Sequence, residues 1–198
     1  MTTSVKSMLT ALILAAPMAA SAADLSAVPS GNYANDTTHS YIQFQYNHLG
    51  LSNPRLGFDE FSINMDLDTA SPENSSVTVT INVDSVITGS EIFHDHLTGE
   101  KWFNTASHDS ISFSSTGITA NADGTYAMTG DLTVREITKP VTLTVTVNNA
   151  MTHPMIKKPV VGISATGDLN RSDWDLGANA PYISDQVTLS IEAEMIAE

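Results

Sequence analysis

Histidines are the side chains that most directly suggest chemistry in this sequence. The chain has six of them and no cysteine, so a zinc site would have to use imidazole and carboxylate ligands. His94 and His96 flank Asp95, but in a helix their rings would point about 200° apart. Because this segment favours a helix and no His-Glu-x-x-His pattern is present, we predict hydrogen-bonding roles for the histidines and no metal site.

Catalytic arrangements are also missing from the sequence. No Gly-x-Ser-x-Gly pattern presents a serine nucleophile, and no thiol is available. The adjacent acids Asp59 and Glu60 would point to opposite faces of a strand, which does not create a pair of facing carboxylates. We therefore predict that the protein is not an enzyme, has no catalytic residue and needs no cofactor.

The few cations are the candidates for binding an acidic headgroup. The chain has 8 Lys and Arg against 22 Asp and Glu, a formal net charge of −14. Arg135, Lys139 and Arg171 lie at the ends of expected strands, where each could bind a phosphate or carboxylate. Ion pairs with neighbouring aspartates such as Asp185 are the alternative that we favour. So few cations exclude a nucleic-acid partner and disfavour attraction to anionic lipid.

Alternating apolar and polar residues run through the chain from Asp24 onward and predict an antiparallel sheet. Turn signals at residues 121–124 and 137–140 keep the connections short. Eight such segments suit a closed barrel that can hold a small ligand or a two-sheet sandwich, and the pattern favours the barrel. The eight segments are residues 42–46, 61–67, 77–83, 111–115, 128–134, 141–147, 161–169 and 187–195.

Two stretches depart from this alternation. Residues 90–103 predict one or two helical turns, with Ser90 as the N-cap and Glu91 in the first turn. Residues 148–159 form the longest polar interruption, and we expect a mobile flap there.

The N-terminal residues have the pattern of a cleaved secretory signal. Lys6 precedes an apolar run from Met8 to Met18, and a small-x-small site ends at Ala22. The run is too short to span a bilayer, and Pro17 interrupts it. We therefore expect residues 1–22 to be a signal peptide and residues 23–198 to be one exported domain without stable membrane insertion. An acidic chain without cysteine fits the bacterial periplasm.

Ordered sequence blocks give the chain a specific family resemblance. It resembles the YceI-like family of exported lipid-binding proteins from about Gly31 to Glu194. The matching blocks are residues 36–40, 48–50, 57–58, 85–89, 95–97, 102–104, 111–116, 130–134, 138–141, 170–174 and 184–185. The chain departs from the family at Glu136, where a glycine is usual, and at Asp175-Leu176, which precede Gly177.

The resemblance implies an all-β fold, an extended eight-stranded antiparallel lipocalin-like barrel with a short helix near residues 90–103. It further implies that a long isoprenoid or alkyl chain lies in the barrel. We predict a carrier of one long-chain apolar molecule, such as a polyisoprenoid, an isoprenoid quinone, a long alkyl amide or a fatty acid. The alternatives are a structural or adhesive barrel or sandwich without ligand and, less supported, a lipid-modifying enzyme. A monomer and a homodimer both stay open.

Inward-facing apolar residues and two polar ones at strand ends are the predicted ligand contacts. A packed barrel core without a cavity is the alternative for each apolar residue. The predicted contacts are Ile42, Phe44, Tyr46, His48, Phe61, Ile63, Val79, Ile81, Phe113, Leu132, Val134, Leu143, Val145, Ile163, Arg171, Leu189 and Ile191.

Overall fold

One antiparallel sheet makes up most of the chain. The computed structural model describes residues 24–198, and the expected signal peptide lies outside this range. Within it no helix is long and apolar enough to cross a membrane. The strands are β1 (Gly31–Asn35), β2 (Tyr41–His48), β3 (Arg55–Phe58), β4 (Phe61–Leu67), β5 (Ser76–Asn82), β6 (Val86–Ile87), β7 (Ser110–Ala120), β8 (Tyr126–Val134), β9 (Ile137–Thr152), β10 (Pro159–Asn170) and β11 (Ile183–Ala197).

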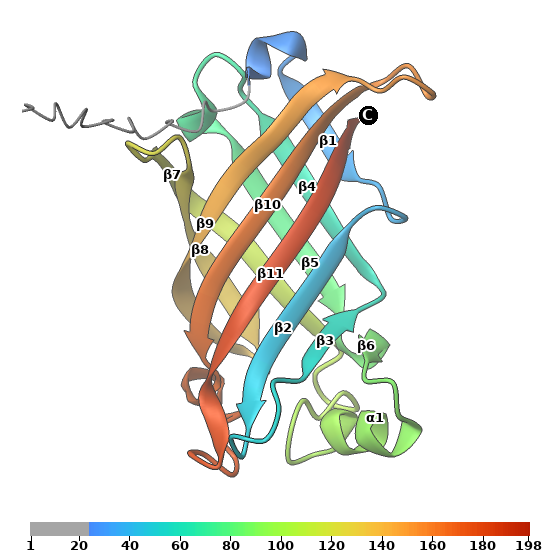
Figure 1. The fold of residues 1–198 in the computed structure, drawn as a ribbon, viewed down its shortest axis with the longest axis vertical. Helices are drawn as coiled ribbons and strands as arrows, with labels where there is room; N and C mark the ends of the chain where they lie inside the picture. The colour runs from blue at the N-terminus through green and yellow to red at the C-terminus, as the bar shows by residue number, and fades with distance from the viewer. Residues whose placement is uncertain (1–23) are drawn as a thin grey trace, which may run out of the picture.

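These 11 segments form a closed barrel of eight strands, because three barrel strands are interrupted. The first interrupted strand consists of β1 and β2, which pair with opposite ends of β11. The second consists of β4, which pairs with β1, and β3, which pairs with β2. The third consists of β5, which pairs with β4, and β6, which pairs with β3. The remaining strands follow in chain order, and β11 closes the ring on β1 (Figure 1). This closure confirms the predicted barrel and excludes the sandwich.

The two ends of the barrel differ in what covers them (Figure 1). At the helical end lie α1 (Glu91–Thr98), η4 (Arg171–Trp174) and the loops of residues 49–54 and 175–182. At the η1 end lie η1 (Leu25–Ala27) and the C-terminus. Two other short helices, η2 (Pro72–Asn74) and η3 (Val83–Ser85), lie next to β5 in the chain.

The helix was predicted from its cap, and the structure confirms it. The Ser90 side chain accepts a hydrogen bond from the Phe93 amide, and Glu91 lies in the first turn. A hydroxyl at this position satisfies one of the free amides that begin every helix. After Thr98 the chain continues in turns through residue 107, so the helix occupies only the first part of the predicted segment.

Two sequence predictions about loops are wrong. The expected flap at residues 148–159 is half strand: β9 continues to Thr152 and β10 begins at Pro159, so only residues 153–158 form the connection. A register shift near Gly162 disturbs the β9–β10 pairing, and such a bulge places polar residues where alternation would require apolar ones. Residues 137–140, where we expected a turn, lie inside β9. A proline is tolerated in this strand because the part of β9 that contains Pro140 has no β10 partner.

The real turn before β9 is made by Arg135 and Glu136, both in the left-handed region with φ of 50° and 65°. Glycine adopts this conformation without strain, whereas other residues do so at a cost. We expect Glu136→Gly to raise the free energy of unfolding by about 1 kcal/mol, which urea denaturation would measure. The control is Glu100→Gly, at an exposed position in the turns after α1, which should not stabilise the protein. An unchanged or lowered stability of Glu136→Gly would contradict the strain argument.

Candidate functional site

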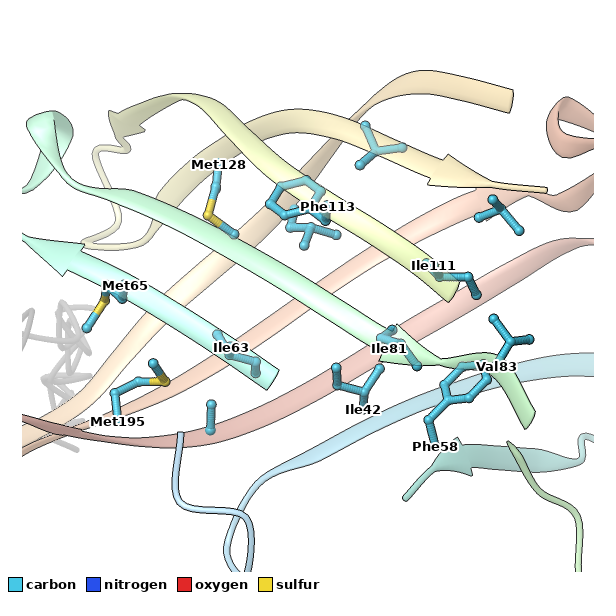
Figure 2. Packing of buried hydrophobic residues seen from close by; sticks show 14 of the residues in the cluster. Ile42, Phe58, Ile63, Met65, Ile81, Val83, Ile111, Phe113, Met128 and Met195 are labelled. Carbon is cyan, nitrogen blue, oxygen red and sulfur yellow. The ribbon is translucent and has the colours of Figure 1, made fainter. Parts of the chain in front are cut away.

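The barrel encloses an apolar cavity of about 630 Å³. This volume lies within the range of about 300–1,000 Å³ that is typical of small-molecule sites. Figure 2 shows part of the buried apolar cluster around it, with Ile63 and Met65 from β4, Ile81 from β5 and Met195 from β11. These four side chains also line the cavity. The cavity runs from Leu25 and Pro72 near the η1 end to His48, Pro54 and Ile183 at the helical end.

The strands make this wall because their side chains alternate between two environments. On β9, Thr144 and Thr146 are exposed on the outer surface, while Val145 and Val147 line the cavity. Yet Val145 and Val147 are only half-buried. Leu189 and Ile191 of β11 likewise line the cavity and are only half-buried. Inward side chains of a packed core would be buried completely, so this part of the barrel is hollow.

Two inward-facing glycines do not create this space. A Cβ added at Gly130 would lie 2.3 Å from the Phe113 ring, and one at Gly167 would lie 2.6 Å from the Leu143 side chain. Phe113 and Leu143 therefore fill the room that these glycines leave.

Polar groups reach the cavity mainly at the helical end, where Tyr46, His48, His96, Trp102 and Arg171 line it. Burial raises the pKa of the Tyr46 phenol, and nearby Arg171 opposes this rise. The Trp102 indole N–H donates a 3.0 Å hydrogen bond to Nε2 of His96, which therefore has no proton at that nitrogen. These groups can orient the polar end of a bound molecule.

The guanidinium of Arg171 is held by backbone carbonyls. Its Nε donates to Ser184 O at 2.9 Å and its Nη2 to Ile183 O at 2.9 Å. Its Nη1 donates to Ala178 O at 3.0 Å and also to Leu176 O. Burial lowers the pKa of Arg171, and nearby Asp185 opposes this shift.

The ion pair that we favoured for Arg171 is not formed among the described residues. The Asp185 carboxylate instead accepts hydrogen bonds from the Ser172 amide and hydroxyl. The guanidinium of Arg171 lies 5.4 Å from the centre of the Trp102 ring, in a cation–π arrangement. Arg171 thus fastens η4 and the following loop against the segment after α1. The other two candidate cations lie outside the cavity wall. Arg135 donates to the Asp175 carbonyl at 2.9 Å and forms an ion pair with the Asp175 carboxylate at 3.9 Å, although Asp175 is not one of the partners that we expected. Lys139 is exposed.

Two further histidines, His94 and His39, have structural partners. His94 donates from Nε2 to the Asp84 carbonyl at 2.9 Å. His39 lies 2.8 Å from the Asp36 carboxylate, which holds the pKa of Asp36 at about 2 and raises that of His39. Asp36, His39 and Glu194 are close enough together for a metal ion. The hydrogen bond of Asp36 with His39, and those that it accepts from Thr38, already account for the arrangement.

All the predicted contact residues except Phe61 line the cavity, although their role in binding stays a prediction. Phe61 is half-buried against the apolar core at the start of β4, immediately after the bend that ends β3, and it does not reach the cavity wall. Alternation missed the wall residues of the non-strand segments, chiefly Trp102, Phe103 and Trp174. Their aromatic character between strands was the available signal. Leu176, one of the departures from the family pattern, is also buried in this wall.

A closed eight-stranded antiparallel barrel around an elongated apolar cavity defines a lipocalin-like fold. The family model for the YceI-like domain matches residues 33–195. The chain therefore belongs to the YceI-like family.

Relatives of known sequence agree with this assignment. A UPF0312 protein of Staphylococcus aureus is 31% identical over 148 residues, which cover 75% of this chain and 84% of that protein. A UPF0312 protein of Shewanella putrefaciens is 37% identical over 143 residues, which cover 70% of this chain and 71% of that protein.

Solved structures have the same fold. The Campylobacter jejuni YCEI protein matches with a TM-score of 0.69 and 27% identity, over 77% of this chain and 90% of that one. Burkholderia cenocepacia BcnA matches with a TM-score of 0.72 and 23% identity, over 83% and 99%. A polyisoprenoid binding domain from Saccharophagus degradans matches with a TM-score of 0.64 and 14% identity, over 86% and 100%.

Proposed function

We propose that this protein is a periplasmic carrier that holds one long-chain apolar molecule in its barrel. The observation that carries the proposal is the set of inward side chains, such as Val145 and Leu189, that line a cavity without filling it. A polyisoprenoid, an isoprenoid quinone, a long alkyl amide or a fatty acid has the required shape. The description of the Saccharophagus domain as polyisoprenoid binding supports the isoprenoid class.

Binding of this kind depends on the apolar surface area that the ligand removes from water and not on a chemical reaction. Each methylene removed from water contributes about 0.8 kcal/mol, so a dozen carbons supply on the order of 10 kcal/mol before ordering costs. The polar groups at the helical end would hold the ligand's head, and no step of catalysis is required. The signal-like N-terminus and the acidic composition support the periplasmic location.

Purification from the native compartment without detergent tests this proposal. We expect native mass spectrometry to show one bound long-chain molecule per chain, released on unfolding and identified in the organic extract. A protein that is empty as purified, and that also takes up no isoprenoid quinone or long alkyl amide in titration, would instead be a structural barrel.

A further inference from the structure

The loops at the helical end present three large apolar side chains to solvent. Leu49 is 51% exposed, Leu51 81% and Tyr182 74%. The two loops that carry them are neighbours, because the Leu49 amide donates to the Tyr182 carbonyl at 2.9 Å. Exposed side chains of this size grouped on adjacent loops are a feature of interaction surfaces. We call these three residues the apolar rim.

Leu49 is in a conformation that its residue type disfavours. Its φ is 58° and that of Gly50 is 70°, and the Leu51 amide donates to the His48 carbonyl at 2.9 Å. A two-residue turn of this form favours Asn or Gly at its first position, and a bulky residue there is strained. The strain is not offset by burial, because half of the Leu49 side chain is in solvent. Folding therefore gives no reason for a leucine at this position.

The two loops of the apolar rim carry little charge for an acidic protein. Residues 48–54 and 176–184 contain no Asp, Glu, Lys or Arg, although the chain has 22 acidic residues. The nearby charges are of opposite sign: Asp175 precedes the second segment, and Lys101 donates to Asn179 within it at 3.4 Å. The η1 end provides a contrast: Met155 and Ile156 are exposed there, but Lys157 and Lys158 follow them directly. An apolar surface with little net charge suits a partner that is itself electrically neutral and apolar below its surface.

The rim is continuous with the cavity. His48, Pro54 and Ile183 belong to the same two loops or to the strand ends that they join, and all three line the cavity. A chain leaving the barrel beside these residues would meet the rim first. Passage through water would expose the whole apolar chain, which opposes exchange by the same free energy that favours binding.

We propose that the apolar rim docks transiently on a bilayer of zwitterionic lipids, so that the ligand passes between membrane and cavity without crossing water. This inference rests on the proposed function. Leucine and tyrosine suit this contact, because aliphatic side chains enter the acyl boundary and tyrosine lies at the headgroup level. Three side chains give a weak contact, which lets a carrier leave again. Negatively charged lipids repel this acidic chain and weaken the docking.

The test measures transfer of an isoprenoid quinone from phosphatidylcholine vesicles to the empty protein. The reporter is quenching of Trp102 and Trp174, which both line the cavity and are the chain's 2 tryptophans. For wild type we expect a transfer rate that rises with vesicle concentration and falls when anionic lipid is added at low salt. The variant Leu49→Ser/Leu51→Ser/Tyr182→Ser should transfer at least tenfold more slowly, with an unchanged Kd for quinone added without vesicles. The matched control Met155→Ser/Ile156→Ser, at the η1 end, should transfer like wild type.

The outcomes separate this inference from the proposed function. Transfer independent of vesicle concentration, or slowed equally by both variants, would overturn rim docking while the carrier function stands. A wild-type protein that is empty as purified and binds neither isoprenoid quinone nor long alkyl amide would overturn both. If flotation showed no association with quinone-free vesicles but the triple variant still slowed delivery to a receiving protein, the rim would be a protein-docking surface.

Leu49→Asn gives a second test, in which we expect the melting temperature to rise and the transfer rate to fall. Asparagine tolerates the left-handed turn, so we expect the melting temperature to rise by about 2–4 °C. The rate of transfer from vesicles should fall severalfold at the same time. A variant that is more stable and transfers at the wild-type rate would show that Leu49 has no part in docking.

Discussion

Replacing Val145 with tryptophan is expected to weaken binding of long chains at least 100-fold while leaving the fold intact. Val145 lies within β9, lines the cavity and is half-buried, and its cross-strand neighbour Ala165 is small. An eight-stranded barrel is just wide enough for side chains to fill it. One indole at this position therefore obstructs the path of a bound chain.

The expected loss is at least 100-fold in affinity. Excluding about five methylenes from the cavity removes about 4 kcal/mol of burial, and each tenfold change in Kd corresponds to about 1.4 kcal/mol. Stability should stay equal or rise, since the new side chain fills empty apolar space. Native mass spectrometry would report the fraction of protein carrying lipid, and urea denaturation would report stability.

Thr144→Trp is the matched control, because Thr144 is the preceding residue and is exposed on the outer surface. It places the same side chain on the same strand outside the cavity and should bind like wild type. If Val145→Trp retained its lipid, the molecule would occupy another part of the barrel. If both variants lost lipid, the loss would result from a disturbance of β9 and not from obstruction of the cavity.

Alternation along the sequence predicted the barrel wall well, because a side chain's direction on a strand depends only on its position in the chain. All eight predicted segments are barrel strands, and most of their inward residues, although not Phe61, line the cavity. The interruptions were not predicted: β1, β3 and β6 have 5, 4 and 2 residues. Segments this short contain too few alternating positions to be separated from turns.

The hollow interior could not be predicted from the sequence at all. Val145 is half-buried and Val141 is buried, yet both line the cavity and occupy equivalent positions in the same alternation. How much of each valine the cavity leaves uncovered depends on the far wall, which is formed by strands distant in the chain. The role of Arg171 was hidden for a similar reason, because backbone carbonyls that gather around a guanidinium have no sequence signature.

Replacing Arg171 with methionine should destabilise the protein by about 3 kcal/mol or more. The change keeps a long apolar stem but leaves the carbonyls of Leu176, Ala178, Ile183 and Ser184 without their donor. A buried polar group left unpaired costs about 1–3 kcal/mol, and water reaches some of these partly buried groups. Trp102 also loses its cationic neighbour. Urea denaturation measures the loss, and Arg135→Met, which removes a hydrogen bond to one carbonyl, should cost about 1 kcal/mol.

Arg171→Lys separates the structural role from a role in binding. A lysine keeps the charge but cannot reproduce the planar fork that reaches several carbonyls at once. If Arg171 mainly fastens η4 and its loop, Arg171→Lys should lose much of the stability that Arg171→Met loses, and both should bind lipids with neutral and with acidic heads in the same ratio as wild type. If Arg171 instead binds an acidic headgroup, Arg171→Lys should keep affinity for fatty acids while Arg171→Met loses it selectively. The carbonyls already engage Nε, Nη1 and Nη2, so the first result is the one that we expect.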